Sequence, residues 1–169
     1  MGTNVSRSTS STRELLDALR WLFQAIRESS RRAEREVGLS GAQLFVLQEV
    51  AEVPILSLVE LARRTRTHPS SVSVVVSRLV RQRLVRRVRA TADARRAELT
   101  LTARGRGLVA RGPDVVQHRL IRAIERLPAN RRRQLAASLG ELARSVAATG
   151  APPPMFFHRV PARNGRSRG

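Results

Sequence analysis

The chain has 169 residues, of which 41% are hydrophobic but only 3% aromatic, so we expect one domain with an aliphatic core. The net charge of +19 indicates a polyanionic partner, nucleic acid first and an anionic membrane surface second. The absence of cysteine excludes a disulfide framework, a thiol redox switch and a cysteine-based zinc site. The sequence has no apolar run of about 18 residues and no signal-peptide pattern at its polar start, so we expect a cytoplasmic protein.

The N-terminal part of the chain predicts a short arm followed by one long helix. Residues 1–12 are rich in serine and threonine and poor in apolar side chains, so we expect them to be disordered. Over about residues 13–37, starting at Thr12 or Arg13, apolar residues recur every three or four positions, as in Leu15, Leu19, Leu22 and Ile26. This period predicts an amphipathic helix with one long buried face.

Two further helix starts carry the same capping signal. Ser40 and Gln43 have the spacing at which each side chain satisfies a backbone N–H of the first turn, and Ser57 and Glu60 repeat it. The two signals predict helices over about Gly41 to Ala51 and about Leu58 to Arg64.

The next helix is predicted to present a serine-rich face. Pro69 suits a first turn, with His68 or Thr67 as the N-cap. An apolar face made by Val72, Val75, Val76 and Leu79 leaves these side chains pointing outward: Ser70, Ser71, Ser73, Val74, Ser77, Arg78 and Arg81. Serine faces are commonly plain solvated surfaces. As the second of two short helices with arginine-rich flanks, however, this one predicts a recognition helix that enters a DNA groove.

A small β-ribbon is predicted after this helix. Val85 to Arg89 and Glu98 to Thr102 have the β-branched and alternating residues of half-buried strands. The polar turn between them carries Asp93, Arg95 and Arg96, which alone fits a generic charged hairpin equally well. From Leu61 to Arg106, however, thirteen arginines face two acidic residues, so +11 of the net +19 falls on this motif. The coincidence of charge and motif predicts a DNA-binding winged helix-turn-helix.

The remaining chain predicts packing helices and a tail. Helical spacing runs from Ala103 to about residue 148, with Thr102 as N-cap and a break at Gly112-Pro113. Together with residues 13–37, residues 103–148 offer more apolar surface than a small lobe can cover, which predicts a homodimer interface. Residues 150–169 are rich in proline, glycine and arginine, so we expect a disordered basic tail. The apolar run Met155, Phe156 and Phe157 fits docking on the body as well as free exposure.

The segment from Asp93 to Gly105, DARRAELTLTARG, resembles the wing signature D-x-R-x-x-x-L-x-L-T-x-x-G of the MarR (multiple-antibiotic-resistance regulator) family of bacterial transcription factors. The resemblance implies a mostly α fold with a small β-wing, in a single domain over residues 13–149. The winged helix-turn-helix would occupy about residues 39–102, between N- and C-terminal dimerisation helices. Arg83 departs from the glycine usual in the family, which predicts a left-handed residue or another turn geometry there. Val74 stands where the family often has arginine.

The family further implies a homodimeric regulator, a repressor in our interpretation, on a pseudo-palindromic site in double-stranded DNA. We expect Arg78, Arg81, Arg86 and Arg87 to neutralise phosphates. Ser70, Ser71, Ser73 and Val74 are the candidates for base contacts. Arg95, with Arg96 second, is the candidate for the minor groove, where Arg95→Ala should cost about 1 to 3 kcal/mol of operator affinity.

Other functions remain to be weighed. The extreme charge and serine-rich face also fit a non-specific, nucleoid-type architectural DNA-binding protein. Membrane-surface association would need a basic amphipathic helix with aromatic anchors, and no segment of the sequence has this pattern. The three histidines are scattered and no phosphate-binding loop follows a strand, so we expect no enzyme, no cofactor and no metal site.

The resemblance also admits a small aromatic effector, bound between the dimerisation helices and the DNA-binding lobe. Trp21, Phe45 and His118 are candidates to line such a site, but each is more simply explained by packing. The effector-binding residues therefore stay unassigned.

Overall fold

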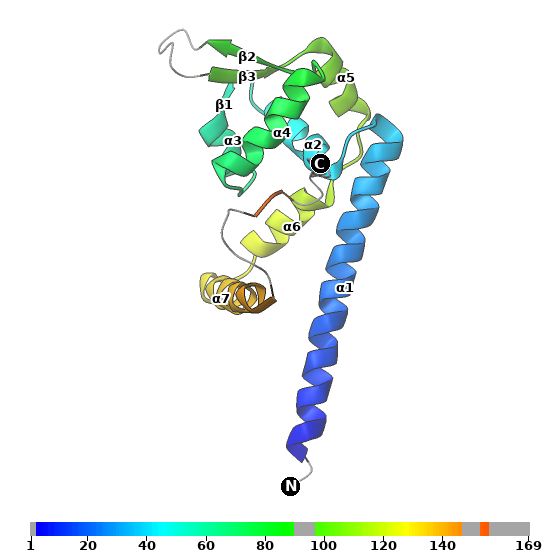
Figure 1. Ribbon diagram of the computed structural model, residues 1–169, viewed down its shortest axis with the longest axis vertical. Helices are drawn as coiled ribbons and strands as arrows, with labels where there is room; N and C mark the ends of the chain where they lie inside the picture. Colours follow the sequence, from blue (N-terminus) through cyan, green and yellow to red (C-terminus); the bar gives the residue numbers. More distant parts are fainter. Residues whose placement is uncertain (1–2, 90–96, 147–152, 156–169) are drawn as a thin grey trace, which may run out of the picture.

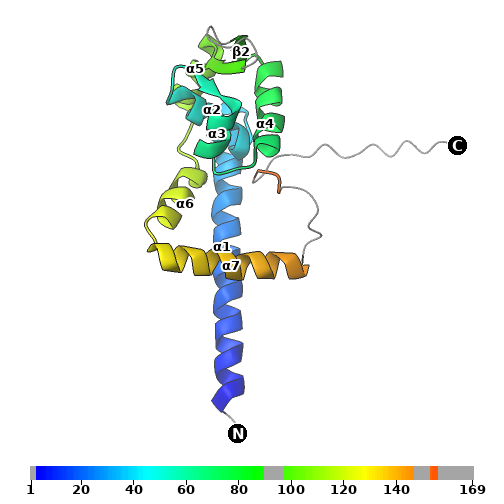
Figure 2. The same cartoon turned by 90° about the vertical axis from the view of Figure 1, so that its left-hand side faces the viewer.

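The computed structural model describes residues 3–89, 97–146 and 153–155 and confirms a mostly helical fold with a small antiparallel sheet. The elements are α1 (Thr3–Val37), α2 (Gly41–Ala51), β1 (Leu56–Ser57), α3 (Leu58–Arg64), α4 (Pro69–Arg81), β2 (Val85–Arg89), β3 (Ala97–Leu101), α5 (Ala103–Arg111), α6 (Val116–Glu125) and α7 (Ala129–Val146). Helices α2 to α5 and the sheet form a lobe at one end of the molecule. Helices α1, α6 and α7 extend away from this lobe, with α7 lying crosswise to α1 (Figures 1 and 2).

Helix α1 begins at Thr3, so the prediction of a disordered arm is wrong from that residue on. The helix contains no proline or glycine, and serine and threonine weaken a helix without breaking it. Side chains one turn apart bind each other along its exposed surface: Ser10 Oγ donates to Glu14 Oε1 at 2.9 Å, and Arg32 Nε donates to Glu36 Oε1 at 2.7 Å. The backbone is therefore helical from Thr3 on, and the side chains of residues 10–12 are exposed on this helix.

The capping box at Ser40 is confirmed in full, and at Ser57 only one of its two hydrogen bonds is present. Gln43 N donates to Ser40 Oγ at 3.3 Å while Ser40 N donates to Gln43 Oε1 at 3.1 Å, so this capping box is complete. Ser57 Oγ likewise accepts from Glu60 N at 3.1 Å, but the Glu60 carboxylate binds Arg63 Nε at 2.8 Å. Both helices have the predicted bounds.

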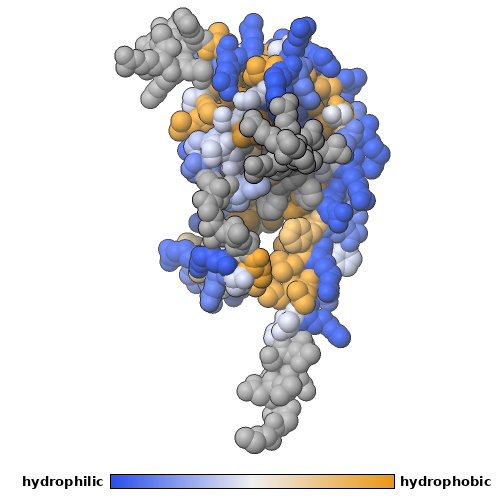
Figure 3. Space-filling model, in the orientation of Figure 1, coloured by the Kyte–Doolittle hydropathy of each residue, from blue (hydrophilic) through white to orange (hydrophobic). Residues whose placement is uncertain are grey.

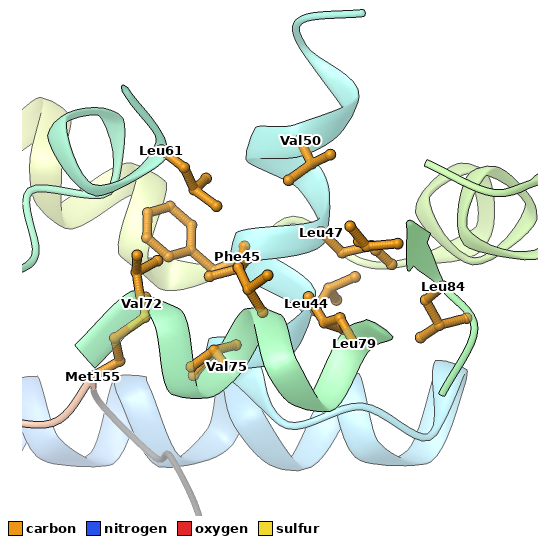
Figure 4. Close-up of a cluster of buried hydrophobic side chains, with 14 of the residues drawn as sticks. Leu44, Phe45, Leu47, Val50, Leu61, Val72, Val75, Leu79, Leu84 and Met155 are labelled. Atoms are coloured by element: carbon orange, nitrogen blue, oxygen red, sulfur yellow. The ribbon is translucent and has the colours of Figure 1, made fainter. Parts of the chain in front are cut away.

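The core lies where α2, α4 and the sheet meet (Figure 4). Nearly every side of α2 is buried, and the predicted inner face of α4 is confirmed, because Val72, Val75, Val76 and Leu79 are all 0% exposed. Each such side chain contributes roughly 1.5 to 3 kcal/mol through burial. This packing fixes the orientation of α4 and hence of its outer face.

The sheet has the strand order β1-β3-β2, one strand more than the predicted two-stranded ribbon. In β1, Leu56 pairs with Leu99 and Ser57 with Glu98 of β3. Two residues are too few to show an alternating pattern, which explains why the sequence did not predict this strand. Thr102 lies outside β3 and caps α5 as predicted, since its Oγ1 accepts from Gly105 N at 3.0 Å.

The C-terminal helices leave apolar side chains exposed. The break at Gly112-Pro113 separates α5 from α6, as predicted. Helix α7 has no buried residue, although Leu135, Leu139 and Leu142 line one side of it. On α1, Trp21, Phe23 and several leucines are exposed as well, and Figure 3 shows hydrophobic surface gathered in the space between α1 and α7. Among the described residues, no helix is long and apolar enough to cross a membrane.

Part of the predicted disordered tail packs against the body. Met155 is only 8% exposed and belongs to the hydrophobic core, and the Pro153 carbonyl accepts a hydrogen bond from Ser71 Oγ at 2.8 Å. Residues 153–155 are therefore not a disordered part of the tail, and of the two alternatives left open for Met155, docking on the body is the one that the structure shows. Phe156, Phe157 and the tail arginines lie outside the described residues.

Candidate nucleic-acid interface

Helix α4 packs on the core by one face and exposes the other. His68 caps it, since Ser70 N donates to His68 Nδ1 at 3.3 Å, and Pro69 occupies the first turn. Opposite the buried valines, Val74 is 47% exposed. Ser70, Ser77 and Arg81 are exposed around it, and Ser73 and Arg78 are partly exposed. An exposed valine among small hydroxyl side chains is a low-relief surface that can approach the base edges of a major groove.

Ser71 is the exception among the predicted outward residues. It is 9% exposed, and its hydroxyl is bound to the Pro153 carbonyl. Ser71 lies one turn before Val75, at the margin of the buried face, and the C-terminal segment covers it. The prediction that Ser71 points outward is therefore wrong.

Each helix of the helix-turn-helix is followed, two residues beyond its last residue, by an arginine with a left-handed backbone. Arg66 has φ 53° and Arg83 has φ 58°, so of the two geometries left open at Arg83 the chain adopts the left-handed one. After α4, Leu84 N donates to Leu79 O and Arg83 N to Val80 O, both at 2.9 Å, and the same two-bond pattern follows α3. This is the Schellman pattern of helix ends, normally completed by glycine, and it turns the chain sharply from α4 into β2.

Arg78 and Arg81 extend from the end of α4 into a surface hollow of about 500 Å³. The opposite wall comes from the end of α1 and the start of α2, where Gln43 Nε2 donates to Gln82 Oε1 at 3.1 Å. The Glu34 carboxylate also lines the hollow, but the two guanidinium groups outnumber it and lie beside the first turn of α2, an arrangement suited to a phosphate. Gln43 and Gln82 were not among the predicted site residues, because only the fold brings them beside the arginines.

The strand arginines do not share one direction. Arg86 pairs with Thr100 and Arg87 with Leu99, and side chains alternate along a strand, so Arg86 and Arg87 leave opposite faces of the sheet. Arg86 Nε donates to Thr100 Oγ1 at 3.0 Å, and Arg86 lines a separate hollow with Arg106. Asp93, Arg95 and Arg96 lie outside the described residues. Hydrophilic side chains crowd the end of the molecule that carries the sheet (Figure 3).

Known proteins are similar to this chain both in sequence and in the arrangement of these elements. A model of the MarR family matches residues 37–96, from the end of α1 into the wing. The chain is 32% identical over 106 residues to the HTH-type transcriptional repressor Rv2887 of Mycobacterium tuberculosis, which covers 63% of this chain and 76% of that protein. This chain belongs to the MarR family.

Other MarR comparisons agree. The HTH-type transcriptional repressor MdtR of Bacillus subtilis is 34% identical over 88 residues, a match that spans 52% of this chain and 57% of MdtR. The crystal structure of Sco3205, a MarR family transcriptional regulator from Streptomyces coelicolor in complex with DNA, aligns with a TM-score of 0.54 at 23% identity, covering 85% of this chain and 90% of Sco3205. A mutant of MarR from Escherichia coli, complexed with operator DNA, aligns with a TM-score of 0.52 at 20% identity, covering 80% of this chain and 96% of that one. These alignments show the winged-helix fold of the MarR family.

In this MarR chain a buried acid joins the lobe to α6. Glu49 of α2 is 8% exposed; its Oε1 lies 3.0 Å from His118 Nε2 of α6, and its Oε2 accepts from Arg64 Nε of α3 at 2.9 Å. The hydrogen bond from His118 and the charge of Arg64 lower the pKa of Glu49 despite burial. The carboxylates of Glu49 and Asp114 raise the pKa of His118. His118 also meets the Phe45 ring edge-on at 4.9 Å, which supports the predicted packing role.

A largely apolar cavity of about 320 Å³ lies between the lobe and α6. Phe45 and residues 65–68 form one wall, α6 forms another and Pro153 to Met155 a third. Of the three candidate effector residues, Phe45 lines this cavity, whereas Trp21 is 70% exposed on α1. Among the described residues, no group of three or more His, Cys, Asp or Glu side chains could hold a metal ion.

Proposed function

We propose that the chain is a sequence-specific DNA-binding transcriptional repressor that works in the bacterial cytoplasm, as a homodimer on a pseudo-palindromic operator. The exposed face of α4 carries the proposal. Its backbone is fixed by four fully buried side chains on the inner face, and its outer face presents small side chains around Val74 from Ser70 to Ser77, with the arginines confined to its C-terminal end. A helix can lie deep in a major groove only if its outer side chains leave room.

The residues divide into two roles. Ser70, Ser73, Val74 and Ser77 are the candidates for base contacts, with Val74 suited to a thymine methyl group. Arg78 and Arg81, in the hollow beside α2, and Arg87 are the candidates for phosphate contacts. Arg86 is proposed for a phosphate on the other side of the wing, and Arg95 and Arg96 for the minor groove, with Asp93 ordering their turn. The names of the relatives, repressors at 32% and 34% identity, support the same role.

The exposed apolar surface supports a homodimer. Leu135, Leu139 and Leu142 on α7 are between 38% and 43% exposed, and Phe23 on α1 is 55% exposed. A second copy related by a two-fold axis would cover these faces and place two α4 helices on symmetric half-sites about one helical turn apart.

The cavity beside α6 is the candidate site for a small aromatic effector. It lies between the lobe that carries α4 and the helices proposed for dimerisation, so a bound molecule contacts both. In the dimer, the two DNA-binding lobes either have the spacing that fits the operator or another spacing that does not. An effector would change DNA binding only if its affinities for these two arrangements differ.

Capture of genomic DNA fragments by the purified full chain, at two salt concentrations, tests the proposal. We expect a pseudo-palindromic motif, and binding to that motif about 10³-fold or more tighter than to a scrambled fragment. Affinities within about tenfold of each other at physiological salt would overturn it in favour of a non-specific architectural protein.

A further inference from the structure

A short piece of the C-terminal tail occupies a cleft between two parts of the molecule. Met155 is 8% exposed and belongs to the hydrophobic core, and its side chain reaches toward Val72 of α4 (Figure 4). Two residues earlier, the Pro153 carbonyl accepts from Ser71 Oγ at 2.8 Å. The segment therefore contacts the first turns of α4 through both its backbone and a side chain.

The chemistry of the segment suits a seated peptide. Two consecutive prolines restrict the backbone and lower the entropy lost on docking. The thioether of methionine is flexible and polarizable, so it adapts to an irregular apolar gap. The segment is also one wall of the 320 Å³ cavity, and α6 is the wall that completes it.

The cavity keeps one unused polar group. Gln117 of α6 is 7% exposed and lines the cavity, and its Oε1 has no hydrogen-bond partner among the described residues. An unpartnered buried acceptor is costly, so the site favours a ligand that brings a hydrogen-bond donor. The prolines of the segment cannot meet this need, because proline has no backbone N–H.

We propose that Pro153 to Met155 is a tethered internal ligand of this cleft. It binds the start of the recognition helix and fills the part of the cleft that borders the cavity opposite α6, and for this space it competes with apolar molecules that carry a hydrogen-bond donor. The inference goes beyond the proposed function, since it holds whether or not the chain binds DNA.

Thiol accessibility tests the seating in the full chain. Because the protein has no cysteine, Met155→Cys introduces a single thiol, and Val74→Cys places one at a position that is 47% exposed. In buffer, we expect dithiobis-nitrobenzoate to react at least about tenfold more slowly with the Met155→Cys variant than with the Val74→Cys variant. In urea, the two variants should react equally fast. Equal rates in buffer would overturn the proposal.

Dye binding tests the competition. N-Phenyl-1-naphthylamine, a neutral dye, combines apolar rings with one N–H donor, and Met155→Asp should raise its affinity for the full chain by about tenfold, by unseating the segment. Val59→Asp, at a position 71% exposed, adds the same charge as the matched control and should change nothing. A peptide with the sequence of residues 150–158 should displace the dye from the Met155→Asp protein.

Ser71→Ala removes only the hydrogen bond to Pro153 and guards against a folding artefact. We expect dye affinity between those of the original chain and Met155→Asp, with unchanged circular dichroism. The same dye affinity in all four proteins, or no displacement by the peptide, would overturn the proposal. Neither the thiol experiment nor the dye experiment uses DNA. A negative result would therefore overturn this proposal without contradicting the proposed function in DNA binding.

Discussion

Glu49 Oε1 and His118 Nε2 lie 3.0 Å apart across the junction between the lobe and α6. The other oxygen of Glu49 binds Arg64, and His118 Nδ1 faces Asp114 Oδ1 at 3.3 Å. One buried carboxylate thereby connects α2, α3 and α6. The orientation of α6, and with it the cavity, depends on this cluster as well as on apolar packing.

The contribution of His118 to stability should depend on pH. Its pKa is raised above 6.5, so its stabilisation is complete below that pH and is lost as the pH rises through the raised value. The pKa of Glu49 is lowered from 4.5, so its contribution is present above that pH and is lost as the pH falls further. We expect His118→Ala to lower the free energy of unfolding by about 1 to 2 kcal/mol near pH 5.5, and by less near pH 8.5, in urea titrations. An equal loss at both pH values would mean that His118 only packs.

Gly105 and Gly107, two residues apart in α5, should respond in opposite ways to alanine. A Cβ on Gly105 would lie 2.2 Å from the Leu84 carbonyl oxygen, whereas a Cβ on Gly107 would have nothing within 4 Å. We expect Gly105→Ala to destabilise the chain by about 1 to 3 kcal/mol through overpacking. Gly107→Ala should stabilise it by about 0.5 to 1 kcal/mol. Thermal unfolding of both variants checks the pair, and a tolerated Gly105→Ala would contradict this close approach.

The left-handed backbone of Arg83 is a stability defect that glycine should relieve. At φ 58° a side chain is strained, so Arg83→Gly should raise the free energy of unfolding by about 1 kcal/mol. Arg83→Ala removes the same charge but keeps a Cβ, so it should bring no such gain. Urea unfolding of the two variants separates strain from charge; equal stabilities would show that the gain, if any, comes from the charge.

Local chemistry made much of the fold predictable. The Ser40–Gln43 capping box and the break at Gly112-Pro113 depend on hydrogen bonds and backbone restrictions within a few residues. The buried face of α4 was predictable because packing against one core imposes the helical period. The left-handed geometry at Arg83 was one of two outcomes implied by the family resemblance, because Arg83 replaces the glycine that is usual at this position.

Long-range contacts were not predictable from the sequence. Ser71 faces inward because a segment from the far end of the chain covers it, and Leu56 joins a strand only because Leu99 lies opposite. The cluster of Glu49, Arg64 and His118 joins three elements; its one signal in the sequence was a lone acid within the apolar stretch GAQLFVLQEVA.

A charge on the apolar side of α7 should prevent the proposed dimer. Leu139 is 40% exposed on the same side as Leu135 and Leu142, and burying an unpaired carboxylate there costs several kcal/mol. We expect Leu139→Asp to be monomeric in sedimentation experiments, with circular dichroism unchanged. Ala137→Asp adds the same charge on the opposite side of α7 and should stay dimeric. If Leu139→Asp also stays dimeric, this face of α7 is not the interface.

Val74 and Arg81 should separate base reading from phosphate binding on one helix. Val74→Ala removes two methyl groups from the exposed face, so it should weaken binding to the captured operator by about 1 kcal/mol and leave binding to scrambled DNA unchanged. Arg81→Ala should weaken both, because a phosphate contact carries no sequence information, and should lower the salt slope of log K by about 1 per protomer. Titrations of both DNAs at three salt concentrations check the pair. Should Val74→Ala weaken both DNAs alike, Val74 does not read a base, and specificity would then have to come from the serines around it or from the shape of the DNA.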